Sequence, residues 1–270
     1  MAVAIAEGRG VHGMPRSWIT VTTTLPQSLG SHENEWNGNC PHPEIRTERL
    51  IIRPLVPSDL IAFHRLRSQP EFMKHTTSGR PDSDIHETQE KLGRLISAPS
   101  SPDAFPFYTY FGIFLKTTGE LIGDGGVHKL ASPACGWPEL GCKLGREYCG
   151  LGYGTEFLRA FTAWWWGLPR YREDGAGGRN VVPMQVRVHP DSVVWDQNHR
   201  DREGHDSMGT DELVIEQLYA WITPENLASQ RMVVKTGLEH FTTWEHPVKK
   251  IPVLGWRQSR YQRSVYPSKL

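Results

Sequence analysis

Three glycines at alternate positions, Gly150, Gly152 and Gly154, stand at the start of a predicted helix. The first N–H groups of a helix have no partner inside it, and the helix dipole places partial positive charge there. Glycines also let the backbone approach a ligand closely. The arrangement is therefore suited to hold a phosphate group. A turn that serves packing alone is the alternative, and the glycines by themselves do not separate the two interpretations.

The elements around these glycines are predicted by hydrophobic periodicity. A strand-like segment, residues 139–144, comes before them, and an amphipathic helix follows. The apolar residues of that helix recur with helical spacing and are Phe157, Leu158, Phe161, Trp164 and Trp165. The predicted order is therefore strand, glycine-rich turn, helix.

Two common phosphate-binding loops do not fit this stretch. A P-loop needs Lys followed by Ser or Thr after its last glycine, whereas Gly154 is followed by Thr155 and Glu156. A dinucleotide-binding fingerprint needs its third glycine three residues after the second, and Thr155 stands there. Neither of these two loops therefore fits the stretch well.

Residues 149–154 resemble motif A of the GCN5-related N-acetyltransferases (GNAT), whose pattern is Gln/Arg-x-x-Gly-x-Gly/Ala. The run Gly-x-Gly-Tyr-Gly-Thr-Glu at 150–156 is similar to the branch that acetylates the N-termini of ribosomal proteins. Two more segments resemble that branch: Thr-Glu-Arg-Leu-x-x-Arg-Pro at 47–54, and Asn-x-x-Ser at 226–229 followed by Lys-x-Gly-Leu at 235–238. Cys149 departs from the pattern, because Gln or Arg is usual there.

The resemblance covers about residues 44–262 and implies a mixed α/β (α+β) fold. It predicts a mostly antiparallel, splayed sheet that is flanked by helices. Residues 1–43 read as an N-terminal extension, in which the β-branched run 18–24 is a candidate strand. The charged, glycine-containing stretch at about 171–213 is longer than an ordinary connection and reads as an insertion.

Local signals place the remaining elements. Strands are expected within 44–55, 107–116, 121–129, 137–144, 181–188, 217–223, 238–244 and 252–260. Helices are expected at 82–97, from Ser58 as N-cap, and from Thr223 as cap to a stop at Gly237. The resemblance makes residues 72–80 a candidate substrate loop.

The resemblance also implies how acetyl-CoA is held. The backbone N–H groups that would bind the pyrophosphate are those of Cys149, Gly150, Leu151, Gly152, Tyr153, Gly154 and Thr155. The strand near Cys142 and Leu144 would pair with the pantetheine arm, and the N–H of Leu144 would polarise the thioester carbonyl. Asn226 would donate to the arm, and Ser229 would lie near the sulfur.

Acetyl transfer by direct attack needs a neutral amine and a proton for the leaving thiolate. Glu139 is the candidate base, since the resemblance places it facing the acceptor channel; an exposed strand glutamate is the alternative. Ser229 is the candidate acid, because Val233 stands where many family members carry Tyr. A thiol at a helix N-terminus has a lowered pKa, which would suit Cys149 for a covalent route, but no His partner lies nearby in the sequence.

Composition restricts the partners. Lys+Arg and Asp+Glu are both 30, which predicts neither a nucleic-acid-binding face nor a basic membrane patch. No run approaches the roughly 20 apolar residues of a membrane span. None of the four cysteines forms Cys-x-x-Cys, and His189, His199 and His205 lack metal-ligand spacing, so we expect no metal. We expect a cytoplasmic monomer or homodimer.

The sequence therefore predicts an acetyl-CoA-dependent N-acetyltransferase that acts on a primary amine, either of a protein N-terminus or of a small molecule. One alternative is a non-catalytic module that binds acyl-CoA and uses the extension and the insertion for protein interaction. An ATP-binding protein is disfavoured by the missing P-loop Lys and by the lack of an acidic Mg²⁺ site.

Overall fold

The computed structural model describes residues 18–26, 44–76, 78–96, 109–168, 170–173, 179–181, 183–195, 213–246 and 250–260. The chain divides into two compact units, which are described in turn. The glycine-loop unit comprises Thr24–Lys129 and Leu140–Met184. The C-terminal unit comprises Met1–Thr23, Leu130–Glu139 and Gln185–Leu270.

The glycine-loop unit is built on strands in the order β6-β5-β4-β3-β2. They are β2 (Ile45–Arg46), β3 (Leu50–Arg53), β4 (Tyr110–Leu115), β5 (Leu121–Lys129) and β6 (Glu139–Leu144). The pairs β2–β3, β3–β4 and β4–β5 are antiparallel. The turn Thr-Thr-Gly-Glu at 117–120 joins β4 to β5 as the sequence predicts.

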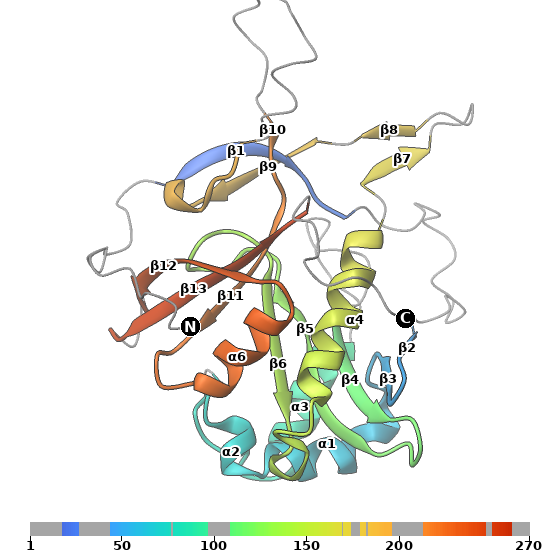
Figure 1. The fold of residues 1–270 in the computed structure, drawn as a ribbon. Coiled ribbons are helices and arrows are strands. Elements are labelled where there is room, and N and C mark those ends of the chain that lie inside the picture. The colour runs from blue at the N-terminus through green and yellow to red at the C-terminus, as the bar shows by residue number, and fades with distance from the viewer. Residues whose placement is uncertain are drawn as a thin grey trace, which may run out of the picture. The chain divides into compact units, whose positions relative to one another are not determined.

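Helices cover both faces of these strands (Figure 1). On one face, α4 (Tyr153–Gly167) packs its aromatic stripe on the sheet, where Phe111 lies 5.2 Å from Trp164 between ring centroids. Gly125 allows this close approach, since a Cβ there would lie 2.6 Å from the Phe157 ring. On the other face lie α1 (Leu60–Arg67), α2 (Pro70–Met73) and α3 (Ile85–Ile96), whose core includes Phe63, Leu66, Phe72 and Leu92 with Phe114 of β4.

The predicted N-cap of α1 was wrong by one residue. Ser58 lies inside a 3₁₀ turn, Pro57–Asp59, and Asp59 is the N-cap of α1. The Asp59 carboxylate accepts from the backbone N–H of Val56 and from Arg53. It therefore fixes the 3₁₀ turn, but it makes no capping hydrogen bond to the first N–H groups of α1.

A buried ion pair ties α1 to the segment before α3. Arg67 donates from Nε and Nη2 to Asp82 at 2.5 and 2.7 Å, and Thr88 donates to the same carboxylate at 2.7 Å. The two charged side chains are 8% and 1% exposed. Burial alone would raise the pKa of Asp82, but the hydrogen bonds from Arg67 and Thr88 outweigh it and lower that pKa.

We expect Asp82→Ala to lower the free energy of unfolding by about 3–5 kcal/mol, because the buried Arg67 loses its counter-ion. Glu90→Ala is the matched control, since its pair with Arg94 is exposed and 3.8 Å long, and should change stability by less than about 1 kcal/mol.

The stability that Asp82 contributes should also depend on pH. Because the pKa of Asp82 in the folded protein lies below the unfolded value near 4, its contribution to the free energy of unfolding is present above that pH and is lost below it. Urea unfolding should therefore show the gap between wild type and Asp82→Ala narrowing from about pH 7 to about pH 3; a constant gap would contradict this.

The C-terminal unit contains two sets of strands. In one, β12 (Glu239–Glu245), β13 (Pro252–Ser259) and β11 (Gln217–Ile222) follow in antiparallel order. At Tyr219, β11 also pairs in parallel with Glu139, the first residue of β6. In the other, the order is β10-β1-β9, formed by β1 (Ile19–Thr24), β9 (Pro183–Val188) and β10 (Leu213–Val214).

The run 18–24 thus forms a strand, and β1 pairs in parallel with β10, which follows it by about 190 residues in the chain. Thr23 Oγ1 also donates to the carbonyl of Val214 at 2.7 Å. The expected insertion at 171–213 contains β9, the start of β10 and a hairpin of β7 (Tyr171–Glu173) and β8 (Arg179–Val181). The boundaries of extension, domain and insertion remain predictions.

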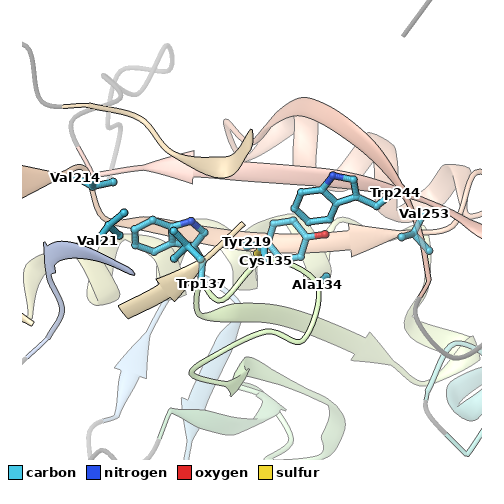
Figure 2. Close-up of a cluster of buried hydrophobic side chains, with 9 residues drawn as sticks. Val21, Ala134, Cys135, Trp137, Val214, Tyr219, Trp244 and Val253 are labelled. Carbon is cyan, nitrogen blue, oxygen red and sulfur yellow. The ribbon is translucent and has the colours of Figure 1, made fainter. Parts of the chain in front are cut away.

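An aromatic cluster forms the core of the C-terminal unit (Figure 2). Tyr219 and Trp244 stack with ring centroids 5.7 Å apart, and Trp137 and Val21 pack in the same cluster. Trp137 Nε1 donates to Ser192 Oγ at 2.9 Å, which satisfies a polar atom in this apolar surrounding. The cluster therefore joins β1 to the strands of the C-terminal half.

The last helix, α6 (Leu227–Lys235), begins later than predicted. Its N-cap is Asn226, whose side chain accepts from the N–H of Ser229, so the assignment of Thr223 as cap was wrong. Gly237 follows the helix with φ +85°, which confirms the predicted left-handed stop.

The prediction of a mixed α/β fold with a mostly antiparallel sheet and flanking helices is confirmed. In the part of the chain that the structure describes, no helix is both long and apolar enough to cross a membrane.

Candidate active site

The glycine loop follows β6 directly. After Leu144 comes a 3₁₀ turn, Arg146–Tyr148, and then Gly150 and Gly152 with φ of +78° and +88°. Gly152 is the N-cap of α4. Such values of φ are costly for residues with a side chain, so the two glycines allow the chain to turn from strand into helix within a few residues.

The amides at the start of α4 precede the hydrogen-bond ladder of the helix. The N–H of Glu156 donates to the carbonyl of Gly152 at 3.0 Å. The N–H groups of Tyr153, Gly154 and Thr155 therefore have no helical acceptor. A Cβ at Gly150 would meet nothing within 4 Å, and Leu151 is 55% exposed, so the loop is open to solvent. This geometry suits an anion held by backbone donors.

The loop is tied to the turn between β2 and β3. Glu156 of α4 accepts from Thr47 Oγ1 at 2.6 Å, from the backbone N–H of Arg49 at 2.9 Å and from Arg49 Nε at 2.7 Å. Arg49 Nη1 donates to the carbonyl of Leu151 at 3.0 Å, and its guanidinium lies 4.4 Å from the Tyr153 ring centroid. Arg49 lies in the Thr-Glu-Arg-Leu motif, but no local pattern connects it to Glu156, which is 107 positions away.

Within the glycine-loop unit, β6 is the outermost strand. On that side β11 pairs with it at Glu139, and beyond that residue an extended ligand with amide groups can pair with the strand. Cys142 and Leu144 lie on this strand and are half-buried. Burial, with the charge of Asp124 adding to it, raises the pKa of the Cys142 thiol well above its usual range, so that this thiol stays protonated.

The expectation that Cys149 has a lowered pKa was wrong. Cys149 lies before the loop glycines and not in the first turn of α4, which begins at Tyr153. Its Sγ donates to the carbonyls of Gly145 at 3.5 Å and of Leu144 at 3.8 Å. Burial, followed by the charge of Glu147, raises the pKa of the thiol. A covalent route through Cys149 loses its physical basis.

Glu139 lies in the C-terminal unit and is 1% exposed, so the alternative of an exposed strand glutamate is wrong. Its Oε2 accepts from Ser132 Oγ at 2.7 Å, and its Oε1 accepts from Trp221 Nε1 at 2.6 Å. The indole of Trp221 stacks on His246 with ring centroids 4.4 Å apart. Both oxygens of the carboxylate therefore accept a hydrogen bond, which fixes the orientation of the Glu139 side chain.

Asn226 and Ser229 lie at the start of α6 in the same unit, and both are half-buried. Asn226 Oδ1 accepts from the N–H of Ser229 at 3.2 Å, so its amide NH₂ remains for another acceptor. A helix serine often donates to the backbone carbonyl one turn earlier. No such bond of the Ser229 hydroxyl is found among the described residues.

The candidate substrate loop and the histidines considered as metal ligands can also be compared with the structure. In the candidate substrate loop 72–80, Phe72 and Met73 are buried in the core, whereas residues 74–75 and 78–80 are exposed. Of the three histidines, His199 and His205 lie outside the described residues. In the described part of the chain, no group of three or more His, Cys, Asp or Glu is placed to hold a metal ion.

The partners of Glu139 are the residues that sequence reasoning missed. Ser132 and Trp221 precede and follow it by 7 and 82 positions, and no local pattern connects them. Trp221 reaches Glu139 because β11 pairs with the start of β6, which is a tertiary feature.

Comparisons with known proteins agree with this geometry. A family model described as an acetyltransferase (GNAT) domain matches residues 49–239. No curated protein matches the chain significantly. A GNAT-family acetyltransferase from Bacillus anthracis is 17% identical, with 81% of this chain and 99% of that one covered and a TM-score of 0.51.

Two other solved structures are similar at the same level. A GCN5-related N-acetyltransferase from Brucella melitensis is 13% identical, with 88% of this chain and 84% of that one covered and a TM-score of 0.53. The microcin C7 self-immunity acetyltransferase MccE, solved with acetyl-CoA and AMP, is 10% identical, with 79% and 93% covered and a TM-score of 0.51. At these identities the likeness shows the fold alone.

Proposed function

Since the family model spans residues 49–239 of 270, this chain belongs to the GNAT family and is an N-acetyltransferase, and we propose that it transfers acetyl from acetyl-CoA to a primary amine by direct attack. The acceptor in this proposal is a protein N-terminus or a small molecule. The resemblance of 47–54 and 150–156 to the ribosomal-protein branch favours the N-terminus.

The observation that carries the proposal is that β6 pairs with β11 at its first residue, Glu139, and then runs on through Cys142 and Leu144 toward the glycine loop. The pantetheine arm would pair with β6 near Cys142 and Leu144, as an added strand does. The pyrophosphate would then meet the backbone N–H groups of residues 149–155, where the helix dipole is favourable. The N–H of Leu144 would polarise the thioester carbonyl as negative charge develops on its oxygen.

The remaining roles in the proposal fall to the side chains of Glu139, Asn226 and Ser229. Glu139 would take the proton of the attacking ammonium directly or through water, and the hydrogen bonds from Ser132 and Trp221 would hold its carboxylate in place. Asn226 would donate its amide NH₂ to a carbonyl of the arm. Ser229 would give a proton to the departing thiolate, since Val233 offers none.

Calorimetric titration with acetyl-CoA tests the donor, with ATP as the control ligand. We expect saturable micromolar binding of acetyl-CoA and none of ATP, because the loop lacks a P-loop Lys. Binding of ATP alone, or of neither ligand, would contradict the proposal.

The acceptor can then be found by following thiol release from acetyl-CoA over a panel of amines. N-terminal peptides of ribosomal proteins are matched with the same peptides already acetylated, and small amines complete the panel. Release with free N-termini only would support a protein acceptor, whereas release with small amines only would contradict the ribosomal-type branch. A cytoplasmic location is part of the same proposal.

A further inference from the structure

Arg49 contacts the glycine loop in three ways from outside it. Its Nη1 donates to the carbonyl of Leu151, its Nε donates to Glu156, and its guanidinium lies over the Tyr153 ring. The three contacted residues flank the N-cap of α4. The Arg49 side chain is 42% exposed, so these contacts are made at the surface of the loop and not in the core.

The contact with Leu151 has a directional consequence. In a planar trans peptide the C=O and the following N–H point in opposite directions. Arg49 holds the carbonyl of Leu151 at 3.0 Å, and so it directs the N–H of Gly152 away from itself. As a glycine, Gly152 can adopt many backbone conformations, and in the structure its φ is +88°. The hydrogen bond that fixes the carbonyl of Leu151 selects one of these conformations.

The contact with Glu156 concerns charge. This carboxylate lies in the first turn of α4, where the diphosphate of the donor is proposed to bind, and an uncompensated negative charge there would repel it. Burial alone would raise the pKa of Glu156, but hydrogen bonds from Thr47 and from Arg49 outweigh it and lower that pKa. The carboxylate is therefore ionised, and the Arg49 guanidinium at 2.7 Å is its counter-ion.

We propose that Arg49 is a positioning residue for acetyl-CoA: it orients the Gly152 N–H toward the pyrophosphate and neutralises Glu156 beside it. The inference rests on the proposed binding of acetyl-CoA at the glycine loop. Cys149 stands at the first position of the loop, where Gln or Arg is usual. In this chain Arg49 places a cation beside the loop from the turn between β2 and β3.

The test compares Arg49→Gln with Arg53→Gln by calorimetric titration with acetyl-CoA. Arg53 is a matched control four residues along: it forms a bidentate pair with Asp59 and lies 3.8 Å from the Phe114 ring centroid, away from the loop. We expect Arg49→Gln to bind acetyl-CoA at least about tenfold more weakly, the size of a lost charge-assisted contact. Arg53→Gln should bind as wild type does, although both variants lose an ion pair and a cation–π contact.

Arg49→Lys is the second variant, in case Arg49→Gln does not fold. A lysine keeps the charge but lacks the planar fork that reaches Leu151 and Glu156 together, so we expect a smaller loss of affinity. Equal binding by wild type and by the folded Arg49 variants would overturn the inference. An equal loss of acetyl-CoA affinity in Arg49→Gln and in Arg53→Gln would also overturn it. Failure of the wild type to bind acetyl-CoA would instead overturn the proposed function.

Discussion

Replacing Gly152 by tryptophan is expected to abolish detectable binding of acetyl-CoA, a loss of at least about a hundredfold in affinity. A Cβ at this position would lie 3.3 Å from Arg49 Nη2, and the indole would extend into the space before the first amides of α4. The positive φ of +88° adds a strain of roughly 1–2 kcal/mol for any residue with a side chain. Calorimetric titration of the purified variant measures the loss.

Gly119→Trp is the matched control for that experiment. Gly119 lies in the turn between β4 and β5 with φ of +72°, and a Cβ there meets nothing within 4 Å. The control therefore carries similar backbone strain without blocking the loop. If Gly152→Trp is folded and still binds acetyl-CoA as well as Gly119→Trp does, the glycine loop is not where the donor binds.

Glu139→Gln is expected to lower kcat by about 10²- to 10⁴-fold, which is the usual contribution of a general base. The affinity for acetyl-CoA should stay unchanged, because the residue is assigned to the acceptor amine and not to the donor. The variant should fold, since the Gln oxygen can accept from Trp221 while its NH₂ donates to the Ser132 hydroxyl. Steady-state rates with an identified acceptor, together with calorimetric titration, provide both quantities.

Trp221→Phe is the control for the Glu139 experiment. It removes the donor to Glu139 Oε1 but keeps the carboxylate and the ring that stacks on His246. We expect a smaller fall in kcat than for Glu139→Gln. A Glu139→Gln variant that turns over at the wild-type rate would remove this residue from the mechanism and leave it a structural acceptor for Ser132 and Trp221.

Elements with strong local signals could be predicted from the sequence. Strand-like runs on both sides of the turn Thr-Thr-Gly-Glu at 117–120 predicted the hairpin of β4 and β5. The helical spacing of Phe157, Phe161 and Trp165 predicted the buried face of α4. The glycines at 150 and 152 were predicted as a turn into a helix for their conformational freedom, and both have positive φ. These signals act within a few residues, where propensity and periodicity are informative.

The features that the sequence did not predict depend on contacts between distant residues. Arg49 and Glu156 are 107 positions apart, and Glu139 and Trp221 are 82 apart. Helix starts were misplaced at Ser58 and Thr223 because several residues in each segment can serve as caps, and the choice depends on the tertiary path of the chain. The raised pKa of Cys149 likewise follows from its burial and from Glu147, and not from the nearby helix end.

The strand β1 has a consequence for the order in which the chain can fold during synthesis. The glycine-loop unit is complete once residue 184 has been made, and it has its own buried cluster. The C-terminal unit draws on residues 1–23 and on 185–270, so that β1 can pair with β10 only after residue 214 has been made. Pairing across such a separation is slow because loop closure must come first. A recombinant protein shortened at its N-terminus past Val21 would lose a strand and part of the aromatic core, although those residues lie outside the matched family domain.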